Sequence, residues 1–513
     1  MYIAPETNIR LLKGVPLDDT YDHTIYFTSL SNQVSYFMGL TKYNLTNYSY
    51  QRVRRGYSRV GIKAELLYDC NYMMFQNSSF GNKWFFAFIK SVEYINNETS
   101  EIEFEIDPMQ TWFFDYELEQ CWVDREHSSS DALWGNLIPE NLELGDYVIG
   151  QDEFENFSSM YVAMLRSQDS DGQPATGRTI GGVYTALGVT GGIPASDSTT
   201  LNGYIAGYVN AGKEDAIRHI YQYPTWLGDA TASRPSFKQH NMAYNTTTVD
   251  GYHPKNKKLF SYPYNFLIVS NNEGQTAEYK WEQWNSMQTV GKFGIAGTYI
   301  PSVQIFLYPM NYRKKEYDFD SGMTLSNFPE CAWVGDYYQQ WIAQNKSSVV
   351  TGIVGNAITG LTNAGNNAPS SVMEAAGRSI LNTGVQIANA VAKIEDIKRV
   401  PPQVHGQAQT ESLNTGMGRV GYTFQQMCLK APFARMVDDY FSMFGYKTNA
   451  IKVPNRNVRP HWCYTKTIGC CIKGTTGLPC DDARKICSIY DAGITFWKSG
   501  SEVGNYSLDN TVQ

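Results

Sequence analysis

The sequence predicts a mainly β fold with a short helical, Gly/Ala-rich insertion. Tyr, Phe and Trp occur 36, 24 and 11 times in 513 residues, and aromatic side chains suit pleated, half-buried surfaces. Charged residues make up only 18%, against roughly 25% in an average soluble protein. Short apolar runs bounded by Asn, Ser and Gly recur along the chain and are typical of strands. These features favour a strand-rich protein with a weakly charged surface suited to contacts with other chains.

The charge balance argues against a dedicated nucleic-acid binder. The net charge is −8 and the sequence pI is about 5.5, whereas such a binder normally carries a basic excess. The first residues do not combine a basic segment with an apolar one, so no secretory signal is expected. No run of 18 strongly apolar residues occurs, so no constitutive membrane span is predicted.

Residues 1–125 are expected to form an N-terminal β domain. Apolar runs at 62–68 and 84–89 indicate strands. The clearest strand lies at 101–107, where carboxylates alternate with apolar residues, so that one face is acidic and the other apolar. The acidic face consists of Glu101, Glu103, Glu105 and Asp107.

Residues 126–255 are expected to form an inserted outer domain because Gly, Ser, Asp and Thr interrupt them often. A helix is predicted at 215–221. The segment 207–214 resembles a phosphate-binding loop except at its last position. There Glu214 replaces the Ser or Thr whose hydroxyl would bind magnesium, so nucleotide binding is not expected.

Residues 256–345 and 401–513 are expected to form a second β region, interrupted by a loop at 346–400. The 27 residues between Lys346 and Glu374 carry no charge. Apolar side chains then recur at helical spacing until Pro401, where proline ends a helix. The loop is either a flexible linker or a conditional membrane inserter, and its apolar spacing favours the second. Its apolar residues are Val349, Val350, Ile353, Val354, Ile358, Leu361, Ile380, Ile387, Val391 and Ile394.

The sequence predicts no catalytic residue, no cofactor and no metal site. Neither G-x-S-x-G nor H-E-x-x-H occurs. His127 lies in a charged stretch, 124–127, that is expected to be a turn. The carboxylates of Asp438 and its neighbour Asp439 point apart in either regular structure, so they form no acid/base pair. Five cysteines crowd the C-terminal region without the spacing of a zinc ribbon and are expected to be ordinary thiols.

A basic cluster beside two tyrosines precedes the acidic strand. Basic residues interleaved with aromatic ones can bind nucleic acid. A solvated strand face or a subunit contact to acidic residues is the favoured interpretation. The cluster consists of Arg52, Arg54, Arg55 and Arg59, with Tyr50 and Tyr57.

Several short motifs occur together in a fixed order. They are Met-Phe-Gln-Asn at 74–77, Gly-Asn-Lys-Trp-Phe at 81–85, Phe-Glu-Ile-Asp at 104–107, Gln-Thr-Trp at 110–112, Arg-Glu-His at 125–127, Pro-Pro-Gln at 401–403, Gly-Tyr-Lys at 445–447, Pro-Asn at 454–455, Gly-Ile-Thr-Phe-Trp at 493–497 and Gly-Asn-Tyr-Ser at 504–507. In this order the chain resembles the tail knob proteins of small picovirus-type podophages. The resemblance covers both ends and the region after about 340, and it is weak between about 130 and 330.

The resemblance implies β-barrel-like tube domains that assemble into a ring, expected to contain six copies, at the distal end of the virion's short tail. The tube would contact other tail proteins on its lower collar side and let double-stranded DNA pass. The loop at 346–400 would plug the tube and enter the host membrane through 347–394. This loop has fewer glycines than the family's. The acidic strand face would line the lumen and repel DNA; an ordinary solvated face is the alternative.

Two other classes of function remain open on the sequence. Trp281, Trp284 and the many tyrosines favour stacking on sugars, as in a host-glycan adhesin. A wall-degrading tail enzyme is the second alternative, although no acid/base constellation supports it.

Overall fold

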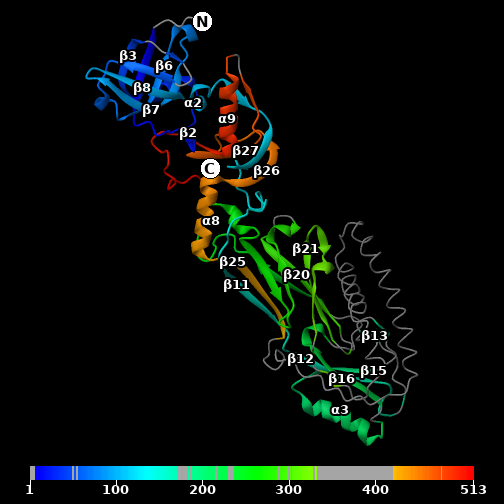
Figure 1. The fold of residues 1–513 in the computed structure, drawn as a ribbon. Helices are drawn as coiled ribbons and strands as arrows, with labels where there is room; N and C mark the ends of the chain where they lie inside the picture. Colours follow the sequence, from blue (N-terminus) through cyan, green and yellow to red (C-terminus); the bar gives the residue numbers. More distant parts are fainter. Residues whose placement is uncertain are drawn as a thin grey trace. The chain divides into compact units, whose positions relative to one another are not determined.

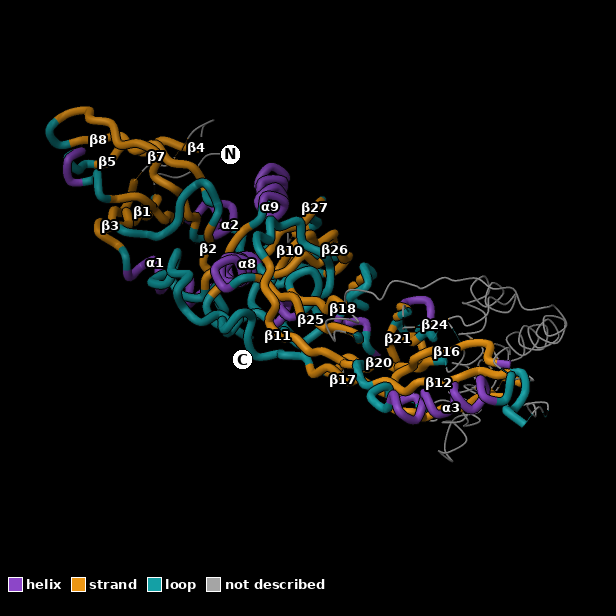
Figure 2. The backbone as a smooth tube through the Cα atoms, turned by 90° about the horizontal axis from the view of Figure 1, so that it is seen from below, coloured by secondary structure: helices purple, strands orange, loops and turns teal. Residues whose placement is uncertain are grey.

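In the described part of this computed structural model, strands are far more frequent than helices, and the predicted mainly β class is confirmed (Figure 2). The structure describes residues 6–48, 51–52, 56–171, 173, 179–180, 183–184, 188–213, 216–228, 236–285, 289–298, 301, 303–326, 328, 330–331, 420–474 and 477–512. No described helix is long and apolar enough to cross a membrane.

The chain forms two compact units, and it passes between them four times. Unit 1 contains Met1–Asp146, Gly251–Phe260 and Lys430–Gln513, and unit 2 contains Tyr147–Asp250 and Ser261–Leu429. The division differs from the expected one, because the C-terminal strands belong to the same unit as the N-terminal strands. The physical reason is strand pairing. Strands near the N-terminus pair with strands near the C-terminus, as β2 does with β29 and β10 does with β26 and β27.

Unit 1 combines two larger sheets with three main helices (Figure 1). Its elements are β1 (Thr7–Lys13), β2 (His23–Ile25), α1 (Leu30–Gly39), β3 (Thr41–Tyr48), β4 (Gln51–Arg52), β5 (Gly56–Val60), η1 (Ala64–Leu66), β6 (Cys70–Gln76), η2 (Ser78–Phe80), β7 (Phe85–Asn96), β8 (Thr99–Ile106), α2 (Pro108–Thr111), β9 (Tyr116–Leu118), β10 (Cys121–Glu126), η5 (Lys257–Phe260), α8 (Ala431–Phe444), β26 (Tyr446–Lys452), β27 (Trp462–Ile468), β28 (Ile472–Gly474), α9 (Cys480–Ala492) and β29 (Ile494–Trp497).

The first sheet of unit 1 has seven strands in the order β3-β1-β6-β7-β8-β5-β4, all paired antiparallel. The second has five strands in the order β2-β29-β27-β10-β26. In it β2 and β29 run parallel, with His23 opposite Thr495, whereas the other pairs are antiparallel. The two ends of the chain therefore complete one sheet, and β9 and β28 form a small ladder beside it.

A large apolar cluster in the core of unit 1 contains residues from both ends of the chain, running from Ile9 to Phe496. Aromatic rings pack closely in it: Phe37 of α1 stacks on Tyr72 with ring centres 5.4 Å apart. From α9, Ile486, Ile489 and Tyr490 join the same cluster. Aromatic and other apolar side chains thus pack the N-terminal sheet against the C-terminal helix α9.

The described residues of unit 2 form three sheets, a two-stranded ladder and one long helix. Its sheets have the orders β11-β25-β18-β19, β15-β12-β16-β24 and β17-β20-β21-β22 with β23 beside β21. Its elements are β11 (Tyr147–Asn156), β12 (Met160–Arg166), β13 (Thr179–Ile180), β14 (Val183–Tyr184), β15 (Gly188–Pro194), α3 (Ser198–Asn210), β16 (Ile217–Pro224), η4 (Thr225–Leu227), β17 (Lys238–Ala243), β18 (Asn265–Ser270), β19 (Thr276–Tyr279), η6 (Trp281–Gln283), β20 (Val290–Gly297), β21 (Ile305–Tyr312), β22 (Lys315–Tyr317), η8 (Phe319–Ser321), β23 (Met323–Leu325), β24 (Glu330–Cys331) and β25 (Gly421–Leu429).

Several expected elements differ from the observed ones. The run at 62–68 contains the short helix η1 instead of a strand. The helix predicted at 215–221 is wrong, because β16 occupies that stretch and pairs with β12 along its length. Alternate residues of β16 are buried, a period of two that sheet pairing imposes. The helices α8 and α9 were not predicted, although the buried residues of α8 follow helical spacing.

Candidate functional site

The acidic face predicted on β8 is present for three of its four carboxylates. Along β8 the side chains of Ser100, Ile102 and Phe104 are buried, whereas the glutamates between them reach the other face. The Nε of Arg59 donates to Glu101 at 2.7 Å, and the hydroxyl of Ser91 donates to Glu103 at 3.0 Å. Two lysines hold the third glutamate: Glu105 pairs with Lys485 and, at 3.7 Å, with Lys90.

Asp107 does not belong to this face, which corrects the prediction. The strand ends at Ile106, and the side chain of Asp107 is buried, where it caps α2 by accepting from the backbone N of Gln110 at 3.1 Å. The hydroxyl of Tyr72 donates to the same carboxylate at 2.7 Å. Burial raises the pKa of Asp107 to about 6, although these hydrogen bonds oppose the shift.

One arginine of the basic cluster, Arg59, contacts the same acidic face. Arg59 lies on β5 opposite Glu101 and pairs with it, while its side chain stays 72% exposed. This fits a solvated strand face, and the expected subunit contact stays a prediction. Arg54 and Arg55 lie outside the described residues. The apolar loop at 346–400, with all ten residues named for it, also lies outside them.

The tryptophans that favoured sugar binding are core residues. Trp281 is 1% and Trp284 3% exposed, and Trp281 stacks on Tyr244 with ring centres 4.3 Å apart. Neither ring is available to stack on a glycan. The segment that resembles a phosphate-binding loop begins inside α3, so its first four residues end a helix instead of leaving a strand.

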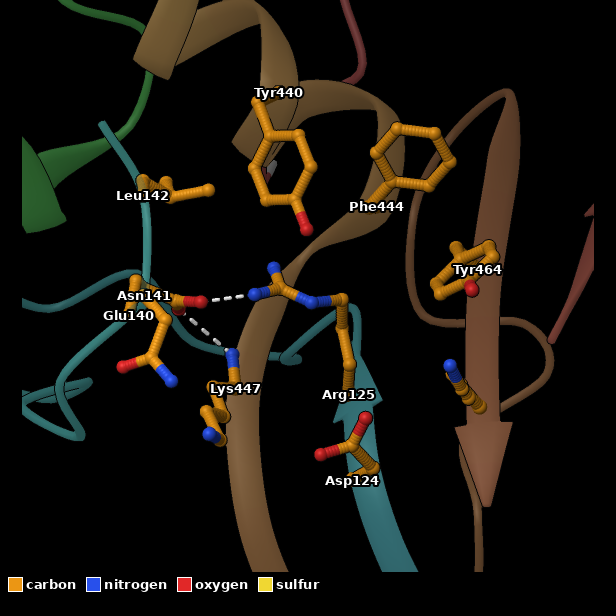
Figure 3. A pocket seen from close by; sticks show the side chains of 10 residues that line it. Asp124, Arg125, Glu140, Asn141, Leu142, Tyr440, Phe444, Lys447 and Tyr464 are labelled. Atoms are coloured by element: carbon orange, nitrogen blue, oxygen red, sulfur yellow. Dashed lines mark hydrogen bonds and ion pairs between the residues drawn. The ribbon is translucent and has the colours of Figure 1, made fainter. Parts of the chain in front are cut away.

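Unit 1 contains an open cavity of about 310 Å³ that sequence reasoning did not predict (Figure 3). In Figure 3, Tyr440 of α8 points toward Arg125 of β10, and Phe444 of α8 lies near Tyr464 of β27. The lining residues are Asp124, Arg125, Glu140, Asn141, Leu142, Tyr440, Phe444, Lys447, Tyr464 and Lys466.

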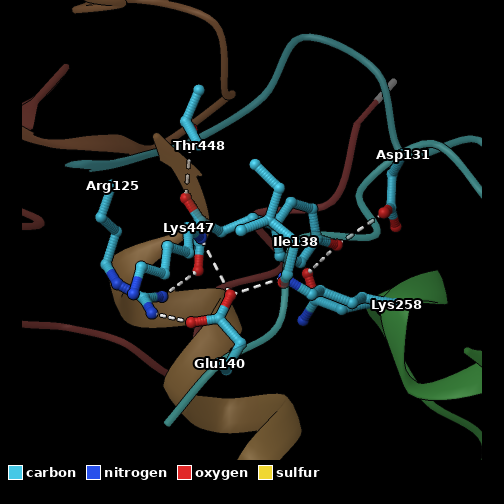
Figure 4. A network of polar contacts seen from close by, with 10 residues as sticks. Arg125, Asp131, Ile138, Glu140, Lys258, Lys447 and Thr448 are labelled. Carbon is cyan, nitrogen blue, oxygen red and sulfur yellow. Dashed lines mark hydrogen bonds and ion pairs between the residues drawn. The ribbon is translucent and has the colours of Figure 1, made fainter. Parts of the chain in front are cut away.

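A buried ion-pair network closes the floor of this cavity around Glu140 (Figure 4). The Glu140 side chain has no exposed surface; it pairs with the guanidinium of Arg125 and, at 2.6 Å, with the ammonium of Lys258. The backbone N of Lys447 donates to it at 2.9 Å. Burial lowers the pKa of Lys258 despite the attraction of Glu140. Four separate segments of unit 1 therefore meet at one carboxylate.

The stretch 124–127 is a buried strand end and not the expected charged turn. Glu126 and His127 are 2% and 1% exposed. Glu126 accepts from the backbone N and side-chain amide of Asn455, at 2.8 and 2.9 Å. Arg125 donates to the carbonyl of Gly445 at 2.8 Å. The motifs at 125–127, 445–447 and 454–455, far apart in sequence, thus contact one another.

His127 is held neutral by its surroundings. Its Nδ1 accepts from the backbone N of Tyr464 at 2.7 Å, so its Nε2 carries the proton and donates to the carbonyl of Ser442 at 3.1 Å. Burial, together with the charge of Arg459, lowers the pKa of His127 to about 3. A proton on Nδ1 would face the Tyr464 N–H.

Asp438 is a structural carboxylate, whereas its neighbour Asp439 is exposed. Asp438 accepts from the Tyr252 hydroxyl and the Lys255 backbone N, both at 2.7 Å. It also accepts from the backbone N and side-chain amide of Asn256. It thus fixes the segment 251–260 to α8. The two neighbouring carboxylates therefore lie in different surroundings, one buried and one exposed.

Among the described residues, no three His, Cys, Asp or Glu side chains are grouped so as to hold a metal ion. Cys463, Cys470, Cys471, Cys480 and Cys487 are free thiols.

Comparison with known proteins places the chain among phage tail proteins. The family model of the tail knob protein gp9 C-terminal domain of Bacillus phage phi29 matches residues 229–511, and the caudoviral major tail protein N-terminus model matches residues 5–117. Tail knob protein gp9 of Bacillus phage PZA and that of phage phi29 are each 26% identical to this chain, over 99% of both sequences; that of phage B103 is 24% identical.

A solved structure shares the fold over nearly the whole chain. The tail knob protein gp12 of bacteriophage C1 superposes with a TM-score of 0.64 at 13% sequence identity, covering 98% of this chain and 99% of that one. Because the gp9 C-terminal model alone matches more than half of the sequence, this chain belongs to the family of phage tail knob proteins and is a structural component of the virion's tail.

Proposed function

We propose that copies of this chain form a closed ring, expected to contain six, that builds the distal tail tube through which the genome leaves the virion. The observation that carries the proposal is the likeness to tail knob proteins over 99% of the sequence. Cyclic rings form when head-to-tail contacts close on themselves. Negative-stain imaging of the purified protein tests this. Rings or short tubes are expected, and a strictly monomeric species at high concentration, measured by light scattering, would contradict it.

The proposed lumen is lined by the β8 face with Glu101, Glu103 and Glu105. Double-stranded DNA carries one negative charge per roughly 1.7 Å of axis, so free cations on a tube wall would hold it. The ion pairs give the glutamates a more specific role than uniform repulsion. Glu101 pairs with Arg59 and Glu105 pairs with Lys485, and these ion pairs keep both cations from binding phosphates.

The test compares genome release from virions that carry variants of this face. Changing Glu101, Glu103 and Glu105 together to Gln frees Arg59 and Lys485, whereas Lys90 keeps its ion pair with Asp19. The variant is expected to slow release several-fold without preventing assembly. Adding Arg59→Gln and Lys485→Gln is expected to restore the rate. The control changes three exposed carboxylates elsewhere, Glu65, Glu316 and Asp439, to Gln. Release as fast in the glutamate variant as in the control excludes this face as the lumen wall.

The loop at 346–400 is proposed to plug the tube and to enter the host membrane through 347–394. The support is its sequence: it lacks charge over its first half, and its apolar residues recur at helical spacing. Apolar side chains of this kind need shelter before ejection and gain about 0.8 kcal/mol for each CH₂ buried afterwards. In a bilayer, helices would satisfy the backbone polar groups.

Dye release from liposomes tests the loop. The intact protein is expected to release dye, and a version without residues 347–394 is expected not to. Equal release by both, or no release by the intact protein at any pH, supports the linker interpretation instead.

We further propose that the role is structural and not enzymatic, with other tail proteins on the collar side as partners. The relatives are named as tail knob proteins, which fits this role. A zymogram on host cell wall is expected to show no clearing. The adhesin alternative loses its main support, because Trp281 and Trp284 are buried.

A further inference from the structure

Three cations lie side by side across three neighbouring strands at the cavity in unit 1. Arg125 of β10 pairs directly with Lys447 of β26 on one side and with Lys466 of β27 on the other. Directly paired residues of antiparallel strands project from the same face, and like charges at such positions destabilise a sheet. All three residues line the cavity. This arrangement costs stability unless anions balance it.

Among the described residues, only the central one of the three cations is balanced by an anion. One terminal nitrogen of Arg125 pairs with Glu140, and the other donates to the carbonyl of Gly445. Glu140 also balances Lys258. The ammonium groups of Lys447 and Lys466 make no ion pair with any described residue, and Asp124, the other lining carboxylate, lies beyond ion-pair distance of both. Two positive charges among the lining residues are therefore left without an ion-pair partner in the described part of the chain.

The opposite wall is aromatic and comes from α8. The guanidinium of Arg125 lies 4.7 Å from the ring centre of Tyr440, which helps to fix both groups. Phe444 meets Tyr464 edge to face, with ring centres 5.1 Å apart. Leu142 adds an aliphatic contact to the lining, so the cavity has an apolar wall as well as a cationic one (Figure 3).

We propose that this cavity binds a phosphate monoester carried on a small ring, such as a sugar phosphate, with Lys447 and Lys466 on the phosphate and the ring against Tyr440 and Phe444. A monoester is a dianion near pH 7, so its charge matches the two lysines. Lysine binds phosphate as a point charge, which suits two flexible lysines carried by the strands that flank Arg125. About 310 Å³ lies at the lower end of the volumes of small-molecule sites and is enough for one such ligand.

Calorimetry and thermal melting of the full-length protein test the proposal, with glucose 6-phosphate as the probe. Binding with an upward shift of the melting temperature is expected. The variant with both Lys447→Gln and Lys466→Gln is expected to bind at least about tenfold more weakly. Without ligand this variant is expected to melt no lower than the parent protein, because it lacks the cross-strand repulsion. Lys473→Gln, at an exposed lysine of β28 outside the cavity, is the matched control and is expected to bind as the parent does.

Three further probes separate the parts of the site. Glucose and the methyl phosphodiester of the sugar are expected to bind much more weakly, since neither carries two negative charges. Inorganic phosphate is expected to bind more weakly than glucose 6-phosphate, because it makes no contact with the aromatic wall. Equal affinity of phosphate and glucose 6-phosphate overturns the ring contact. Equal affinity of the parent and the double variant, or no binding of glucose 6-phosphate at millimolar concentration, overturns the site itself.

Discussion

The β8 face and the Glu140 network both join carboxylates to cations, but they differ in their contact with water. The Glu101 and Arg59 side chains are 23% and 72% exposed, whereas Glu140 and Lys258 are 0% and 2% exposed. Exposed ion pairs contribute little because water screens them, whereas a buried charge that loses its partner is costly. The first arrangement suits a surface that other molecules slide past, and the second fixes the fold.

Removing the buried carboxylate gives the largest expected effect. Glu140→Ala leaves Lys258 and Arg125 as uncompensated buried charges and is expected to lower the free energy of unfolding by about 3–5 kcal/mol. Denaturant unfolding of the full-length protein measures it. Glu143→Ala, at an exposed neighbour, is the control and should change stability little. If both variants unfold at the same denaturant concentration, the network does not stabilise unit 1.

Asp438 and Asp439 provide an internal comparison on one helix. Asp438→Asn places an amide among donors from Tyr252, Lys255 and Asn256 and is expected to cost about 2–3 kcal/mol. Asp439→Asn changes an exposed group and is expected to be nearly neutral. Thermal or denaturant unfolding of the two variants measures the difference, and similar losses for both would contradict the assigned hydrogen bonds.

Acid should destabilise unit 1 through His127. Its pKa is about 3 in the folded state and near 6.5 in the unfolded chain, so the unfolded state takes up the proton first as the pH falls. The stabilising effect of neutral His127 is complete above about pH 6.5 and decreases toward pH 3. At pH 5 the expected loss is about 2 kcal/mol.

The measurement is the difference in unfolding free energy between pH 7.5 and pH 5. His127→Gln is expected to make this difference smaller, whereas His253→Gln, at an exposed histidine, should leave it unchanged. An identical pH dependence in the parent protein and His127→Gln would show that another group controls acid unfolding.

The β8 face should give the smallest effect on stability. Each of Glu101→Gln, Glu103→Gln and Glu105→Gln is expected to cost less than about 1 kcal/mol, because its partners are partly exposed. Melting temperatures measure this, at low and at high salt. A loss as large as that of Glu140→Ala would remove the distinction between the two regions.

The sequence allowed the exposed region to be predicted better than the buried one. The alternation around Glu101 is local, so it identifies one strand and both of its faces. The prediction from this alternation fails at Asp107, one residue past the strand, because Asp107 caps the helix α2 and does not pair in the sheet. The Glu140 network has no local signal, because its members lie in segments separated by more than 100 residues in three of the four cases.

The helices show a different limit. In α8, Ala434, Val437 and Phe441 are spaced as one helix face, so this helix was available to sequence analysis. The stretch at 217–224 lacked such a signal for a strand, and its pairing with β12 decided its structure. The family resemblance was confirmed by the comparisons, since its motifs keep their order although each is short.

The pairing of β2 with β29 determines when the second sheet of unit 1 can form during synthesis. This sheet cannot be completed until the ribosome has made Trp497. About 300 residues must be synthesised after β10 before β26 is available to pair with it. At roughly 5–20 residues per second, this delay lasts from about 15 s to a minute. Unit 2 is complete in sequence by Leu429 and so is free to fold first. During that interval the aromatic N-terminal sheet lacks α9, and a nascent chain is then most prone to wrong association. Premature truncation before residue 497 should therefore yield aggregated protein with a folded central unit.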